Sequence, residues 1–314
     1  MRNKFNSYVR VGSKALAFAV PLLMLVGAAA GLLTAYPGIA AAQKEGGGGG
    51  NGPTAPPNLD HFYCYFASGR VQPQTVLLQD QFDAALKQTE QIQDLRIIRF
   101  CNPVQKTTAN GTVTQIQHPD DHLTMYLINP QPIIPRAVIV RNQFGTQQLR
   151  TGNAVLLAVP SGKVWPVPVT APPQTPPIPT DLDHFKCYLA SGKPLDRTVL
   201  LQDQFFKDTA GVLAAALQPI LFCNPVQKSV PNPNPLVGGV ITTPITNPVA
   251  HLTCYVTTRR AFQSTLLYDN QFSPQLTPLA VLNPDFLCVP SFKLRWAEIP
   301  VPSTLVPPGD ENGD

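Results

Sequence analysis

The stretch that decides the fold is His184-Phe185-Lys186-Cys187-Tyr188, followed by Asp203-Gln204-Phe205 and by Cys223-Asn224-Pro225-Val226-Gln227-Lys228. The same frame of His, Cys or Met, Tyr, an Asx-Gln-Phe triplet, Cys or Ala, and Lys occurs four times along the chain. The other three copies begin at His61, His122 and His251. A frame that recurs in this way predicts equivalent structural units.

Apolar residues alternate with period two within each copy, which predicts strands. In copy three, Phe185, Cys187 and Leu189 share one face of the opening strand, and this face is expected to lie in the core. The opposite face carries polar and aromatic residues. Aromatic rings beside polar donors suit sugars and peptides, so this face is a candidate binding surface, although the same tyrosines could instead lie under a loop and bond to it. The recurring residues of this candidate face are His61, Tyr65, His122, Tyr126, His184, Tyr188, His251 and Tyr255.

Each copy also predicts how its later strands end. The Asx of the triplet stands in an apolar row, and we expect it to bond nearby backbone N–H groups and turn the chain after the Phe. A proline two residues beyond the last cysteine slot is expected to close the final strand. Residues 83–96 and 206–218 favour a short helix by composition. The prolines concerned are Pro103, Pro160, Pro225 and Pro290.

The six cysteines of the chain occupy two slots in three of the copies. Copy two lacks both cysteines and has Met125 and Ala158 in their place. Loss of both slots together predicts that each bridge forms inside one copy, because a bridge between copies would have stranded a partner. The expected disulfides are Cys64–Cys101, Cys187–Cys223 and Cys254–Cys288.

Residues 1–42 are predicted to be a signal peptide, in which basic residues precede an apolar run and Ala40-Ala41-Ala42 offers a cleavage site. The run is also long enough to span a bilayer, so an uncleaved anchor is the alternative and would be the one expected membrane contact. Four of the 23 lysines and arginines lie in this segment, which leaves 19 basic against 19 acidic residues in the rest. A chain without net charge or a basic cluster gives no reason to expect nucleic-acid binding. The expected location is secreted, periplasmic or cell-surface, where disulfides persist.

The strand pattern predicts an all-β protein, and the spacers between the copies divide it into two tandem sandwich-like domains. A Gly-rich linker spans 43–57, and a Pro-rich linker spans 167–180. Each domain is expected to contain two homologous half-repeats and to have the size of a two-sheet sandwich. The boundaries are 58–166 for domain one (58–107 and 119–166), 181–296 for domain two (181–229 and 248–296), and 297–314 for a disordered tail.

Catalysis is not expected, because an active site needs different groups that converge once, whereas these residues recur in equivalent places. The chain has no Gly-x-Ser-x-Gly elbow, His-Glu-x-x-His, phosphate-binding Gly loop or Cys-x-x-Cys pair. An Asp-His dipeptide such as Asp183-His184 does not chelate one metal ion from a strand, since neighbouring side chains point to opposite faces. Each His is instead expected to bond a carbonyl or carboxylate, and the closing lysines are expected to be solvated or paired with Asp. No cofactor is expected.

Several motifs resemble a domain of unknown function found, often in tandem, in exported proteins of myxobacteria and their relatives. These motifs are Asp183-His184-Phe185-Lys186-Cys187-Tyr188, Leu201-Gln202-Asp203-Gln204-Phe205, Cys223-Asn224-Pro225-Val226-Gln227-Lys228 and His251-Leu252-Thr253-Cys254-Tyr255. The resemblance covers about 58–296 and implies exported bacterial origin, with no activity, ligand or catalytic residue to transfer.

The leading hypothesis is therefore an exported, non-catalytic, disulfide-stabilised structural or binding module of the cell envelope or exterior. The first alternative is a carbohydrate- or peptide-binding protein that uses the His/Tyr face or a cleft between domains, with envelope polysaccharide or protein as partner. The second alternative is a secreted hydrolase or metal-dependent enzyme.

Overall fold

Each copy contributes a short opening strand, a strand that ends at the Asx, and a long closing strand. The computed structural model describes residues 56, 58–69, 75–86, 89–92, 95–129, 134–166, 176–207, 209–232 and 238–299, so the expected signal peptide and most of both linkers and the tail lie outside the described residues. The elements are β1 (Phe62–Gly69), β2 (Val76–Asp80), α1 (Gln81–Leu86), β3 (Glu90–Ile92), β4 (Arg96–Thr108), β5 (Val113–Thr114), β6 (His122–Leu127), β7 (Arg136–Asn142), β8 (Gly145–Val164), β9 (Phe185–Gly192), β10 (Arg197–Asp203), β11 (Val212–Pro231), β12 (Val240–Thr243), β13 (His251–Thr257), β14 (Gln263–Asn270) and β15 (Ser273–Glu298). The expected all-β class is confirmed. Within the described part of the chain, no helix is long and apolar enough to cross a membrane.

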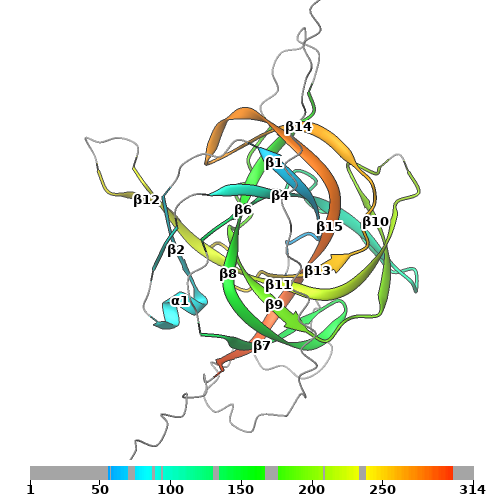
Figure 1. Ribbon diagram of the computed structural model, residues 1–314, viewed down its shortest axis with the longest axis horizontal. Coiled ribbons are helices and arrows are strands. Elements are labelled where there is room, and N and C mark those ends of the chain that lie inside the picture. The colour runs from blue at the N-terminus through cyan, green and yellow to red at the C-terminus, as the bar shows by residue number, and fades with distance from the viewer. Residues whose placement is uncertain are drawn as a thin grey trace, which may run out of the picture. The chain divides into compact units, whose positions relative to one another are not determined.

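The opening and closing strands of all four copies form one closed antiparallel ring. Its order is β1, β4, β6, β8, β9, β11, β13 and β15, and β15 pairs back with β1. Figure 1 shows these strands arranged around a common centre. The two separate sandwich domains predicted from the linkers are therefore not formed. Strands of copy two pair with strands of copy three, and copy four pairs with copy one, so both expected domains share a single sheet.

The strands that end at the Asx lie outside this ring and reach across to the diagonal copy. There each one pairs with the far half of a long closing strand: β2 of copy one with β11 of copy three, and β10 of copy three with β4 of copy one. In the same way β7 of copy two pairs with β15 of copy four, and β14 of copy four pairs with β8 of copy two. Each copy thus completes its diagonal counterpart.

The closing strands run straight through their prolines, so the prediction that proline ends them is wrong. The residue after the proline resumes the ladder: the Val104 N–H donates to the His61 carbonyl at 2.8 Å, and the Val226 N–H donates to the His184 carbonyl at 2.9 Å. In an antiparallel pair only alternate residues donate toward a given neighbour, so a missing N–H at the proline is tolerated. This continuation makes the closing strands long enough to receive the diagonal Asx strands.

Of the two predicted helices, only the start of 83–96 is helical, since β3 follows within that range, and the described part of 206–218 is not helical. Residues 81–86 form α1, but the segment after copy three's triplet turns and enters β11 at Val212. Gly211, with φ +86°, permits that turn. Pairing of β11 with β10 then overrides the helical composition of this segment.

Alternation along the strands separates two buried clusters. The inner cluster contains residues from all eight strands of the ring, so it fills the ring interior. The three disulfides lie in it and join directly opposed residues of neighbouring strands, as predicted: Cys64–Cys101, Cys187–Cys223 and Cys254–Cys288. Met125 faces Ala158 at the equivalent position of copy two. The outer cluster lies on the opposite face of the ring strands and includes the recurring tyrosines.

Candidate functional site: four Asx clusters

Four equivalent clusters, here called the Asx clusters, gather the recurring polar residues on the outer face of the ring. Each cluster takes its Asx-Gln-Phe triplet from one copy and its Tyr from the diagonal copy, which is two positions away around the ring. Its Lys comes from the copy that precedes the triplet's copy around the ring, so copy four precedes copy one. The Asx residues are Asp80, Asn142, Asp203 and Asn270, and all four are buried.

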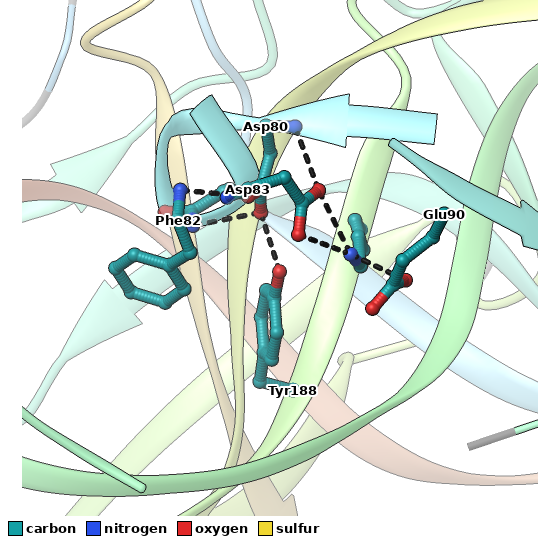
Figure 2. Close-up of polar contacts among 7 residues, drawn as sticks. Asp80, Phe82, Asp83, Glu90 and Tyr188 are labelled. Carbon is teal, nitrogen blue, oxygen red and sulfur yellow. Dashed lines mark hydrogen bonds and ion pairs between the residues drawn. The ribbon is translucent and has the colours of Figure 1, made fainter. Parts of the chain in front are cut away.

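A tyrosine hydroxyl bonds to the Asx side chain in every cluster. The Tyr188 hydroxyl donates to Asp80 Oδ2 at 2.8 Å and points at that carboxylate in Figure 2. The Tyr65 hydroxyl donates to Asp203 Oδ2 at 2.7 Å. In the other two clusters the Asx is an asparagine, and its amide is the donor to the tyrosine. Asn142 Nδ2 donates to the Tyr255 hydroxyl and Asn270 Nδ2 donates to the Tyr126 hydroxyl, each at 2.9 Å. The structural interpretation of the tyrosines is therefore right, but their partner is a side chain of the diagonal copy.

The Oδ1 atom of each Asx caps the turn that follows it. Oδ1 accepts the main-chain N–H of the triplet's Phe at 2.8 to 3.0 Å in all four clusters. This confirms the expectation that the Asx ends the regular ladder and turns the chain.

A third partner changes together with the Asx. The two aspartates accept from an asparagine side chain: Asn224 Nδ2 donates to Asp80 at 2.9 Å, and Asn102 Nδ2 donates to Asp203 at 3.0 Å. The two asparagines donate instead to a serine hydroxyl, Asn142 to Ser291 at 3.1 Å and Asn270 to Ser161 at 3.0 Å. Each acceptor atom of an Asx side chain thus faces a donor, and each donor atom faces an acceptor. The sequence signal for this pairing is the alignment of Asn-Pro-Val in the odd copies with Val-Pro-Ser in the even copies, in which the Asn precedes the proline and the Ser follows it.

The closing lysines lie over phenylalanine rings, contrary to the expectation that they are solvated or paired with Asp. The Nζ atoms of Lys106, Lys163, Lys228 and Lys293 lie 4.8 to 5.0 Å from the ring centroids of Phe144, Phe205, Phe272 and Phe82, respectively. Three of them also donate to the triplet's glutamine: Lys106 to Gln143, Lys163 to Gln204 and Lys293 to Gln81. Burial lowers the pKa of Lys106 and of Lys228 to about 8 and that of Lys163 to about 7.

The recurring histidines are buried beside these lysines. Burial lowers the pKa of His184 to about 3, and the positive charge of Lys228 acts in the same direction. Burial and the adjacent lysine lower the pKa of the other three as well, so all four imidazoles are neutral at pH 7. The ring of His251 stacks on Phe222, with centroids 5.6 Å apart. Neither nitrogen of His251 has a hydrogen-bond partner within the described residues, so the expected bond to a carbonyl or carboxylate is not found there.

The Asx cluster around Asp80 carries charges that the others lack. Lys186, buried beneath it, forms ion pairs with Asp83 at 2.9 Å and with Glu90. Burial lowers the pKa of Lys186, but the carboxylates of Asp80, Asp83 and Glu90 outweigh it and the net shift is upward. Burial, followed by the charge of Asp80, raises the pKa of Asp83 to about 6 although Lys186 opposes this.

The cluster around Asp203 joins the same two copies as the Asp80 cluster. It has aromatic residues at the positions where the Asp80 cluster has charged ones. The position that corresponds to Lys186 is Tyr63, whose ring packs on Tyr65. The position that corresponds to Asp83 is Phe206, which packs on Phe262 with centroids 5.5 Å apart. The two diagonal contacts between copies one and three therefore differ in chemistry.

The candidate binding face does not form a surface. Its eight residues are at most 3% exposed, because the Asx strands of the diagonal copies cover them. The aspartates of the Asp-His dipeptides in the odd copies accept main-chain N–H groups: Asp60 from Gln117 and His118, and Asp183 from Thr246 and Asn247. Over the described ranges, no three His, Cys, Asp or Glu side chains are placed to hold a metal ion. The recurring polar residues thus bind one another.

Comparison with known proteins agrees with a repeat architecture. No curated protein and no solved structure matches the chain. A family model described as a repeat of unknown function (DUF7450) matches residues 127–289, from the opening strand of copy two to the closing strand of copy four. Because this match covers more than half of the 314 residues, the chain belongs to the DUF7450 family of repeats of unknown function.

Proposed function

We propose that the protein is an exported, non-catalytic structural or binding module of the cell envelope or exterior. The observation that carries the proposal is that the polar residues recurring in all four copies are buried and bonded across copies. Residues used in this way specify how the copies assemble. Three internal disulfides suit an oxidising compartment, and the predicted leader supplies the route to it.

The burial of most of the recurring basic groups supports a structural role. A general base or nucleophile must reach its substrate, whereas Lys106 and Lys228 are at most 1% exposed and the recurring histidines at most 3%. Their pKa values are lowered by burial first. Lowered pKa values of this kind are what burial of polar groups inside a repeat assembly produces.

Expression of the full chain in a bacterial host, followed by cell fractionation and intact-mass measurement, tests the proposal. We expect an exported product that begins at Gln43 and has no free thiol. A full-length product with reduced cysteines in the cytoplasm would refute export. Metal analysis and a panel of ester, glycoside and peptide substrates test the non-catalytic part, and turnover that persists after repurification would refute it.

Ligand binding is the second candidate function, and a pocket between α1 and β15 favours it. The pocket has a volume of about 240 Å³ and is lined by Gln81, Ala84, Ala85, Lys293, Leu294, Arg295 and Trp296. The guanidinium of Arg136 lies 5.6 Å from the Trp296 ring centroid. Arg136 is 1% exposed and is not among the lining residues, so the cations that line the pocket itself are Lys293 and Arg295. An indole beside cationic groups suits an acidic sugar.

A Trp165→Phe variant tests this candidate, because it leaves Trp296 as the sole tryptophan and fluorescence reporter. Titration with a glucuronate oligomer is expected to change the emission, and neutral dextran is expected not to. The added substitution Arg295→Gln, at an exposed lining residue, should weaken the response several-fold. An emission unchanged by glucuronate would exclude an acidic-sugar site at Trp296.

A further inference from the structure

Two of the three disulfides touch one another inside the ring. Cys64 Sγ and Cys288 Sγ lie 3.8 Å apart, although Cys64 is bonded to Cys101 and Cys288 to Cys254. Both sulfurs are already in disulfides, so the contact is not a hydrogen bond. It places the sulfur of one bridge within van der Waals reach of the sulfur of the other.

This contact lies at the seam of the ring, where β15 of copy four pairs with β1 of copy one. The other neighbouring copies follow one another along the polypeptide, whereas the seam brings residues 62–69 against residues 279–288. The bidentate pair of Arg99 with Asp285, at 2.8 and 3.0 Å, also spans it. None of the three disulfides crosses the seam.

We propose that Cys64–Cys101 and Cys254–Cys288 form an exchange pair, and that opening either bridge yields a single Cys64–Cys288 bridge that fastens the seam. A phosphine or thiol reductant supplies two electrons, and with two protons it converts Cys254–Cys288 into two thiols. The Cys288 thiolate then attacks Cys64 Sγ, so that the Cys64–Cys288 bond forms as the Cys64–Cys101 bond breaks. Cys101 leaves as a thiolate and takes up the proton that Cys288 released. The products are one disulfide and thiols at Cys101 and Cys254.

Burial favours exchange over further reduction. All six cysteines are fully buried, so a second reductant molecule needs another opening of the ring, whereas the neighbouring sulfur is already in contact. Loop length sets how strongly each bridge stabilises the folded ring against unfolding. Cys64–Cys288 spans 224 residues, compared with 37 for Cys64–Cys101 and 34 for Cys254–Cys288. A bridge that closes a longer loop restricts the unfolded chain more.

The double variant Cys101→Ala/Cys254→Ala tests the proposal, because it leaves Cys64 and Cys288 without their native partners. Peptide mapping without reduction is expected to recover a Cys64–Cys288 peptide and no free thiol. The matched control, Cys101→Ala/Cys223→Ala, leaves Cys64 on β1 and Cys187 on β9, two strands that do not pair. The control is expected to carry two thiols that react once the chain is denatured. Free thiols at Cys64 and Cys288 in the first variant would overturn the proposal.

Wild-type protein provides a second test that does not depend on how the variants fold. The protein is treated with less than one equivalent of phosphine, quenched in acid and alkylated. The partly reduced fraction is expected to carry its labels at Cys101 and Cys254. Labels on both members of Cys64–Cys101, or on both members of Cys254–Cys288, would show that no exchange occurs.

Discussion

At the residue scale, each Asx acts as a junction between two copies. One oxygen holds its own turn, and the remaining atoms bond to a tyrosine and to an asparagine or serine of the diagonal copy. Sequence reasoning predicted the turn, because the Asx and its turn are neighbours in the chain. It missed the tyrosine partner, because Tyr188 and Asp80 lie 108 residues apart and meet only when the copies assemble.

Removal of a tyrosine hydroxyl should cost more where the Asx is charged. Tyr188→Phe and Tyr65→Phe remove one of the two side-chain donors to a buried, charged aspartate oxygen and leave only the asparagine, and we expect a loss of about 1.5 to 3 kcal/mol in the free energy of unfolding. Tyr126→Phe faces the neutral Asn270 and should cost about 0.5 to 1.5 kcal/mol. Urea unfolding of the three variants checks the ranking. Equal losses would show that the charge of the Asx does not matter.

Lys228 should destabilise the folded protein at neutral pH. It is 1% exposed, and no described residue accepts a hydrogen bond from its Nζ. Burial lowers its pKa to about 8, below the usual 10.5, so between these values the unfolded chain binds more protons and stability rises with pH. Lys228→Met should therefore raise the free energy of unfolding by about 1 to 3 kcal/mol at pH 7.

Measurements at two pH values separate this effect from simple packing. The gain from Lys228→Met should shrink by pH 9.5, where the folded wild type has already released the proton. The exposed Lys193→Met provides the control and should change stability little at either pH. A gain that is the same at both values would mean that the charge of Lys228 is not the cause.

At the element scale, period-two alternation is enough to predict the opening strands and their inner face, because apolar residues alternate with polar and aromatic ones. It does not predict that the outer face is buried too, or that Leu189, at the end of the apolar row, is 45% exposed. The closing strands are longer than the sequence predicts, because proline at Pro103 and Pro225 does not end them. Proline lacks only a donor, and these prolines sit where the next residue donates. The segment before β11 shows the limit of composition, since strand pairing decided its structure.

A fourth disulfide should form in copy two. Met125 and Ala158 are directly opposed on β6 and β8, in the same relation as the cysteine pairs of the other copies. Met125→Cys/Ala158→Cys is therefore expected to lose two hydrogens by intact mass. It should gain about 2 to 4 kcal/mol, unless the loss of the methionine side chain leaves a cavity. Met125→Cys alone should keep a free thiol. A double variant with two reactive thiols would contradict the equivalence of the copies.

At the scale of the whole molecule, the two-domain expectation failed because linker composition says nothing about pairing between distant strands. The Pro-rich stretch at 167–180 predicts a boundary, yet β8 before it and β9 after it pair with each other. Four copies share one inner core, and each Asx strand completes a diagonal neighbour. The Asx strand of each copy pairs with the copy two positions away, so a single copy on its own lacks this pairing. We therefore do not expect one copy to fold alone.

Cleavage of the chain between the second and third copies tests this closed assembly most directly. A protease site inserted at 167–175 would separate copies one and two from copies three and four, and no disulfide links these halves. One closed sheet predicts that the cut protein elutes as a single complex of unchanged size under native conditions, and that the halves part under denaturing, non-reducing conditions. Two folded halves that elute separately after native cleavage would show instead that the chain forms two independent domains.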